Sequence, residues 1–203
     1  MRFFQLGRVS RTVLLACWAL VILISPLRAD GDWKGYLAAD LRGFVESAEF
    51  QEQSPNPQFS IVFEPEFNLD LHREGETFTF KPFVRLDSLD SRRTHLDIRE
   101  LYWHKAKGTW EVVVGLDKVF WGVTESQHLV DIINQTDLVE NPDREDKLGQ
   151  PMVRFSLIRD WGIVDFFVLP GFRERTFAGS DGRLRPGIAV SSESVYESAA
   201  ENK

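Results

Sequence analysis

Cysteine is almost absent from this chain: Cys17 is the only one among 203 residues, and it lies within an N-terminal apolar run. If that run is removed, no thiol remains, which excludes disulfide bonds and thiolate metal sites. After residue 29 no stretch is apolar enough to form a transmembrane helix. The sequence also has no fixed-period repeat and no low-complexity tract. These absences exclude a disulfide scaffold, a helical membrane protein and a solenoid.

The first 29 residues have the pattern of a secretory signal peptide. Arg2, Arg8 and Arg11 form a basic start, an apolar run covers 13–27, and Leu27-Arg28-Ala29 offers a cleavage site. The run has about 15 residues and is broken by a proline, short of the roughly 20 that a spanning helix needs. We therefore expect a cleaved signal rather than a membrane anchor.

Positive charge is outnumbered by negative charge in the chain after residue 29. The formal charge of the chain is −7, and removal of residues 1–29 takes four arginines and no acid with it, which leaves −11. An acidic exported chain is a poor candidate for binding nucleic acid, so we expect no such partner. About 174 residues remain, enough for one domain.

The segment 59–71 alternates between apolar and polar side chains over its whole length. Successive side chains of a strand point to opposite faces, so one face is apolar and the other is largely acidic. A core strand of a soluble sandwich has the same period. The length also matches a membrane-crossing strand of about 9–11 residues, and together with the export signal it favours an outer-membrane β-barrel.

Similar alternation recurs along the chain. We predict an all-β fold, an antiparallel meander of about seven strands at 33–45, 59–71, 77–87, 94–105, 110–120, 152–159 and 163–172. This meander, within residues 30–177, would form part of a transmembrane β-barrel, with a long loop at 121–150 after the fifth strand. Residues 178–203 form a polar tail, expected to be a loop before a further strand.

Two irregularities fall inside these predicted strands. Pro65 and Pro82 lie near the middle of one hairpin, where proline cannot donate to the ladder, and we interpret them as a shared kink. In the fourth strand the apolar residues change phase, which predicts a bulge near Arg99-Glu100 that re-aims both charges.

Four segments carry a resemblance: Gly115–Gly122 (GLDKVFWG), Leu129–Asp137 (LVDIINQTD), Leu169–Arg173 (LPGFR) and the tail Tyr196–Glu201. They resemble the porin-like outer-membrane proteins of Gram-negative bacteria over roughly residues 33–201. The resemblance implies a passive channel for small solutes, with outer-membrane lipid and the barrel-assembly machinery as partners, and leaves a homo-oligomer open. Such proteins are usually about twice as long and end in an aromatic residue, so we expect this chain to be the N-terminal part of a barrel.

Polar residues on the second phase of the strands are the candidates for a lumen-facing surface. They are Asp40, Arg42, Glu64, Glu66, Asn68, Asp70, Lys81, Arg85, Asp87, Asp97 and Arg99. Within the long loop, the candidates for a constriction are Trp121, Glu125, Asp131, Asn134 and Asp137. Asp131 and Asn134 would brace this loop through hydrogen bonds to backbone.

Two rival functions remain at this point. One is a soluble periplasmic β-domain that binds a small ligand, with the apolar phase as its core. The other is a barrel-borne hydrolase that uses Glu64 and Glu66, about 7 Å apart on one face; charged neighbours on a wetted strand are far commoner, so we predict no enzyme. The four histidines after the signal have no metal-ligand spacing, and neither a metal nor a cofactor is expected.

Overall fold

A computed structural model describes residues 31–53, 57–71, 73–120, 132–141, 143–185 and 187; the predicted signal lies outside these ranges. No helix occurs among the described residues, and so none that is long and apolar enough to cross a membrane. The strands are β1 (Gly31–Arg42), β2 (Gln58–Asp70), β3 (Glu76–Asp87), β4 (His95–Lys107), β5 (Trp110–Asp117), β6 (Asp137–Leu138), β7 (Gln150–Arg159), β8 (Gly162–Val168) and β9 (Thr176–Phe177).

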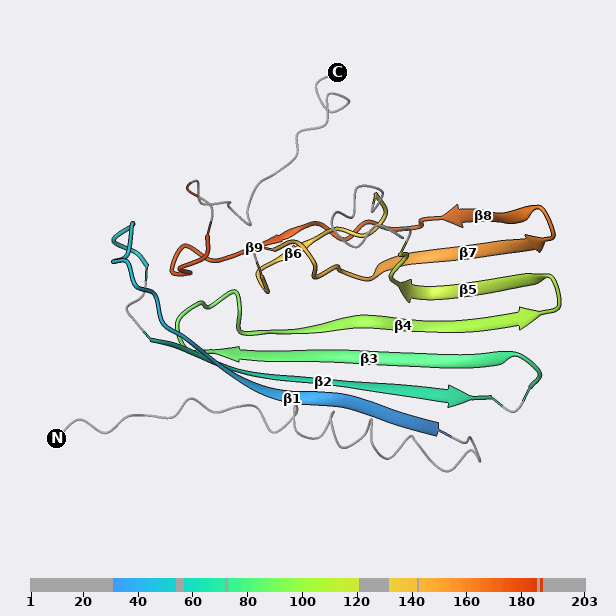
Figure 1. The fold of residues 1–203 in the computed structure, drawn as a ribbon, viewed down its shortest axis with the longest axis horizontal. Coiled ribbons are helices and arrows are strands. Elements are labelled where there is room, and N and C mark those ends of the chain that lie inside the picture. The colour runs from blue at the N-terminus through green and yellow to red at the C-terminus, as the bar shows by residue number, and fades with distance from the viewer. Residues whose placement is uncertain are drawn as a thin grey trace, which may run out of the picture.

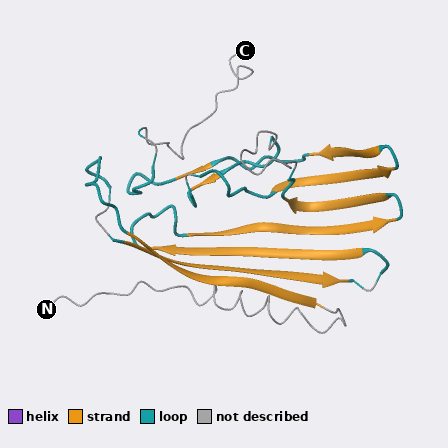
Figure 2. Ribbon diagram, viewed as in Figure 1, coloured by secondary structure: helices purple, strands orange, loops and turns teal. Residues whose placement is uncertain are grey.

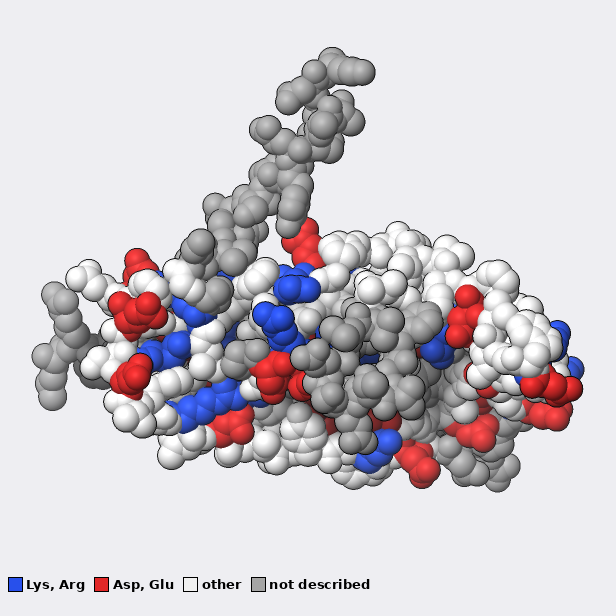
Figure 3. All heavy atoms as spheres, turned by 45° about the horizontal axis from the view of Figure 1, so that its top comes forward, with Lys and Arg blue, Asp and Glu red and all other residues white. Residues whose placement is uncertain are grey.

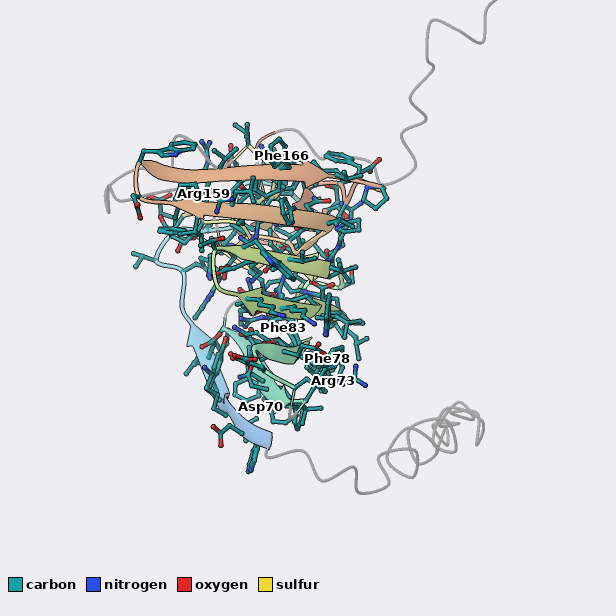
Figure 4. The ribbon with its side chains drawn as sticks, turned by 90° about the vertical axis from the view of Figure 1, so that its right-hand side faces the viewer. Asp70, Arg73, Phe78, Phe83, Arg159 and Phe166 are labelled. Atoms are coloured by element: carbon teal, nitrogen blue, oxygen red, sulfur yellow. The ribbon has the colours of Figure 1, made fainter. Side chains whose placement is uncertain are left out.

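Seven of these strands form one sheet in the order β1-β2-β3-β4-β5-β7-β8, and every neighbouring pair is antiparallel (Figure 1). The predicted all-β meander of seven strands is therefore confirmed. Strands β6 and β9 form a separate parallel pair. Seen from the end of the sheet, the strands follow one another from β1 to β8 as a single stack (Figure 4).

Three strands end three or four residues earlier than the sequence predicted, and the backbone pairing of each stops at that point. β1 stops at Arg42, which pairs with the first residue of β2. β5 stops at Asp117, opposite the first residue of β7. β8 stops at Val168, after which the Gln150 side chain bonds the backbone N–H and C=O of Arg173 in place of a strand. The alternation continues past each of these points, but backbone pairing does not.

The two faces of the sheet have the reverse of the usual polarity. In β2 the apolar phase is exposed, as at Phe59, Ile61 and Phe63, whereas the other phase is buried, as at Ser60 and Val62. A soluble sheet buries its apolar face and wets its polar one. The strand therefore presents its apolar side to the surroundings.

The same inversion holds at both edges and in the middle of the sheet. Trp33 and Leu37 of β1 are 75% and 72% exposed, and Phe166 of β8 is 56% exposed. By contrast Arg85 of β3 and Asp117 of β5, on the other face, are each 5% exposed. In Figure 3 the upper edge of the molecule, just to the right of its middle, is a patch of uncharged side chains.

The predicted bulge is confirmed in β4. Lys81 pairs with Glu100 and Pro82 with Ile98, so Arg99 is the extra residue. The insertion returns the apolar residues of β4 to one face and keeps Arg99 and Glu100 on the polar face. Pairing of β2 with β3 is interrupted between Phe63–Val84 and Phe67–Phe80, and the unchanged register sets Pro65 opposite Pro82. Neither proline can donate a hydrogen bond to the ladder, so both lie in the same interruption of the β2–β3 pairing.

Connections differ in length between the two ends of the sheet (Figure 2). Short turns, at the right of the view, lie at 71–75, 108–109 and 160–161. Long connections, at the left, lie at 43–57, 88–94 and 118–149. We call these the short-turn end and the long-loop end; Figure 4 faces the short-turn end, where Asp70, Arg73 and Arg159 lie.

Candidate functional site

Two stretches of chain are bonded to the polar side chains of the sheet at the long-loop end. They are residues 132–141 and 143–149, before β7, and residues 173–185, after β8, and we call them the covering segments. Their strands β6 and β9 pair in parallel, Asp137 with Thr176 and Leu138 with Phe177. The short pairing joins the two segments into one layer.

Arg85 of β3 binds this layer through a carboxylate. Its Nε donates to both carboxylate oxygens of Glu140, at 3.0 and 2.7 Å, and its Nη2 lies 2.6 Å from Oε2. Nη1 donates to Asp40 of β1 and to Ser60 of β2, each at 2.8 Å. Four strands or segments therefore meet at one guanidinium, whose planar donors suit such multiple contacts.

Arg99, the bulge residue of β4, makes the second link. Its Nη1 donates to Asp137 Oδ2 at 2.5 Å and to Asp97 at 3.1 Å. Thr176 of β9 donates to the other oxygen of Asp137. Burial alone would raise the pKa of Asp137, but the Arg99 charge and these hydrogen bonds outweigh it and hold the pKa below its ordinary value.

Arg173 makes a third link, from the second covering segment. Its Nη2 donates to Asp97 of β4 at 2.6 Å. Its Nη1 donates to the carbonyl oxygens of Ile98 and Gly149, each at 3.1 Å. The part of β4 before the bulge, which has no partner in β5, is therefore bonded by a side chain instead of a strand.

Arg93, in the β3–β4 connection, is the most deeply buried cation of the group. It bonds the carbonyl oxygens of Val139 and Glu140 and lies 3.1 Å from Asp87. Burial, followed by the Arg85 charge, lowers the pKa of Arg93 from its ordinary value, although a guanidinium stays charged at neutral pH.

Asp90 ties the same connection to the second covering segment. Its carboxylate accepts from the backbone N–H of Gly179 at 3.2 Å and from that of Arg92 at 3.0 Å. Burial raises the pKa of Asp90, and the nearby Asp181 carboxylate adds to the rise against the hydrogen bonds. Asp90 is thus a buried acid that holds its proton more strongly than an ordinary aspartate does.

Asn134 fixes the first covering segment to the end of β5. Its Oδ1 accepts from the backbone N–H of Val119 at 2.8 Å. Its Nδ2 donates to the carbonyl oxygens of Asp117 and Leu148, each at 2.9 Å. One side chain therefore provides the hydrogen-bond partners of three backbone groups where the long connection begins and ends.

Nearer the short-turn end the polar face carries a second, more open group. Lys81 lies 2.8 Å from Glu64, and Lys34 lies 3.1 Å from Glu66. Asn68 donates to Glu66 and accepts from Thr79, each at 2.8 Å. Glu64 and Glu66 each have an ammonium partner, which disfavours the pair as acid and base of a hydrolase.

The lumen-facing candidates therefore fall into two sets. Asp40, Arg42, Arg85, Asp87, Asp97 and Arg99 lie in the ion-paired group at the long-loop end, and Glu64, Glu66, Asn68 and Lys81 in the open group. Asp70 lies exposed at the end of β2. Of the constriction candidates, Asn134 and Asp137 lie in the first covering segment, whereas Trp121, Glu125 and Asp131 lie outside the described residues.

Five residues of the β3–β4 connection and the covering segments were not singled out from the sequence: Asp90, Arg93, Glu140, Arg173 and Thr176. These parts of the chain have no alternation of side chains that signals a face. Ser60, Lys34 and Thr79, which lie on the strands, were not singled out either. Only Arg173 had a signal, as the basic residue of the LPGFR turn.

His95, Asp137 and Glu140 are the one metal-like group found among the described residues, with a ligand atom each within 4.8 Å of one another. Glu140 is already paired with Arg85 and Asp137 with Arg99. A metal ion there would meet two guanidinium charges, and like charges at such distances repel. The arrangement favours an ion-paired clamp over a metal centre.

Comparison with protein-family models, with curated proteins and with solved structures finds no match for this chain.

Proposed function

We propose that this chain supplies part of the wall of an outer-membrane β-barrel that passes small solutes passively. The observation that carries the proposal is the inverted sheet, with an exposed apolar face and a buried polar one. Strands that face lipid alternate apolar-out and polar-in. In water the same apolar face would be an aggregation hazard, whereas lipid would cover it at no such cost.

Aromatic residues on the exposed face support the proposal. Trp33 pairs with Phe67, which stacks on Phe80 at 6.2 Å, and Phe155 lies 6.4 Å from both Trp110 and Phe166. These rings come from six of the seven strands, on their short-turn side. Barrels place such aromatic girdles at the membrane interface.

Loop lengths support the same orientation. Outer-membrane barrels have short periplasmic turns and longer external loops, and here every short turn lies at one end and every long connection at the other. The long-loop end is then external, and the covering segments narrow the lumen from that side. Charged groups of both signs line the polar face, and the selectivity of passage would follow from these charges and from the width of the lumen. Passive passage of this kind needs no catalytic group.

The two edges of the sheet, β1 and β8, have no further strand among the described residues. In a bilayer each unpaired backbone group costs several kcal/mol. The proposal therefore includes further strands, from more of the same chain or from a second copy, that close the barrel.

Membrane fractionation tests the proposal. The full chain is expressed in a Gram-negative host, and the membranes are separated by density. We expect the protein in the outer-membrane fraction, extracted only with detergent, and a conductance when it is added to a planar bilayer. Recovery in the periplasmic fraction without detergent would contradict the proposal and favour a soluble ligand-binding domain instead.

A further inference from the structure

A pocket at the long-loop end lies outside the ion-paired group. Its lining includes Phe44, Val45, Glu46, Glu49 and Gln53 of the β1–β2 connection and Arg183 and Arg185 of the second covering segment. Its volume is about 380 Å³. That volume lies in the range of small-molecule sites, roughly 300–1,000 Å³.

The wall of the pocket is held by one glutamine. The Gln53 side-chain oxygen accepts from the backbone N–H groups of Glu49 and Phe50, at 2.9 and 3.2 Å. Its Nε2 donates to the carbonyl of Gly182 at 3.2 Å. This hydrogen bond joins two stretches of chain that are far apart in sequence. The two walls of the pocket are therefore held together by a specific contact.

Both arginines of the pocket are positioned by aromatic rings. The Arg183 guanidinium lies 4.8 Å from the ring centre of Phe44 and donates to the Glu46 carbonyl at 2.6 Å. The Arg185 guanidinium lies 3.8 Å from the ring centre of Phe50. Stacking on a ring orients a guanidinium and leaves its in-plane N–H donors available.

Arg185 has unused donor capacity. Its side chain is only 4% exposed, and its Nε–H is buried with no hydrogen-bond partner in the structure. Its Nη2 lies 3.4 Å from Glu52, a side chain that is itself 70% exposed. Nε–H and Nη2–H form one edge of the guanidinium, the edge that binds a carboxylate with two parallel hydrogen bonds. A buried donor without an acceptor is costly, so this edge is suited to a ligand.

We propose that this pocket binds a small solute through its carboxylate group, held on the Nε/Nη2 edge of Arg185 with Arg183 close by. Glu46 and Glu49 balance the two arginine charges of the lining, which disfavours multiply charged anions and leaves room for an ammonium group on the same solute. Exposed Val45 offers an apolar contact for the carbon chain. Glu52 competes weakly for the same edge of Arg185.

The pocket itself does not depend on the membrane. Its role as the external site that gathers solute for the channel rests on the proposed function.

Ligand-observed NMR titration of the detergent-solubilised full chain tests the inference with three probes of matched skeleton: butyrate, 2-aminobutyrate and butylammonium. We expect the two carboxylates to bind and the cation not to bind. Butyrate alone would identify a simple carboxylate, and stronger binding of 2-aminobutyrate would identify a zwitterion. Equal binding of butylammonium, or no binding of either carboxylate, would overturn the inference.

Three variants sharpen the test. Arg185→Gln should weaken butyrate binding by about 10- to 100-fold, as expected for loss of hydrogen bonds to a charged group. Glu52→Gln, which removes the competitor, should strengthen it by a few-fold. Arg144→Gln, which removes one exposed arginine elsewhere, should leave it unchanged. Unchanged affinity in a folded Arg185→Gln protein would overturn the inference.

The two proposals fail separately. A chain that inserts into the outer membrane and conducts, but binds no carboxylate, overturns only the pocket. A chain that binds butyrate and stays soluble in the periplasm overturns only the membrane proposal.

Discussion

Arg99 of β4 donates to Asp137 of β6 at 2.5 Å, and their side chains are only 4% and 1% exposed. The pair joins the strand that carries the bulge to the first covering segment. Because the bulge turns Arg99 onto the polar face, the ion pair depends on one extra residue in one strand.

Breaking this pair should be costly. Removing one partner of a buried pair leaves an uncompensated charge, so Arg99→Gln should lower the free energy of unfolding by about 3–5 kcal/mol. Urea unfolding in detergent micelles measures the loss. Lys34→Gln removes a more exposed pair with Glu66 and should cost less than about 1 kcal/mol. Equal losses in the two variants would show that the Arg99 pair does not hold the layer.

A charge on the exposed apolar face should block assembly. Leu37→Arg or Phe63→Arg, at positions that pair directly in β1 and β2, should each cost roughly 2–4 kcal/mol if the side chain faces the middle of a bilayer. The amount of protein in the outer-membrane fraction is the readout. Thr109→Arg, in an exposed short turn, serves as the control and should insert normally. Normal insertion of both strand variants would show that this face does not meet lipid.

Gly115 of β5 should tolerate no side chain. Its φ is +139°, and a Cβ there would lie against the Leu101 carbonyl and 2.8 Å from Tyr102 Cα in β4. Gly115→Val should therefore lower stability by about 3 kcal/mol, from backbone strain and loss of the local pairing. Gly43→Val, where nothing lies within 4 Å, is the matched control. Thermal unfolding of the two variants compares them directly, and similar midpoints would refute the close approach.

Asp90 should make stability depend on pH. Its folded pKa is raised by burial and by Asp181, so the folded protein keeps this proton at pH values where the unfolded chain has released it. Stability should therefore fall as pH rises from about 4, the ordinary carboxyl value, through the raised pKa. Asp90→Asn keeps an acceptor oxygen but does not titrate, and should lose less stability between pH 4 and pH 7 than the original chain does.

Denaturant unfolding at several pH values measures that difference. Asp160→Asn, at the exposed β7–β8 turn, controls for the loss of a carboxyl group. If the Asp90→Asn curve has the same pH slope as the original chain, Asp90 is not the buried acid that the geometry indicates.

The sheet followed from the sequence because strand patterns are local. Alternation around Phe63 predicted β2, and the change of phase in 94–105 predicted the bulge near Arg99-Glu100. Strand ends were overestimated because a side-chain pattern does not report whether a partner backbone is present. Gly43–Val45 continue the alternation of β1 with no residue of β2 opposite.

The site could be predicted from the sequence only in part. Polar phases predicted which strand residues share a face, so Arg85 and Arg99 were candidates. Their partners Glu140 and Asp137 lie 55 and 38 residues further along the chain, in a connection whose path no local pattern encodes. Asp137 was a candidate through the loop resemblance, whereas Glu140 had no signal at all.

The most direct test of the membrane account is a single-cysteine scan along β2. With Cys17 replaced by serine, the chain has no other cysteine, and spin labels are placed one at a time at residues 59–64 in protein reconstituted into lipid. The account predicts a period of two: labels at 59, 61 and 63 are accessible to lipid-soluble oxygen, and labels at 60, 62 and 64 are not. Uniform access to a water-soluble relaxation agent along all six positions, or high oxygen access on the polar phase, would contradict it.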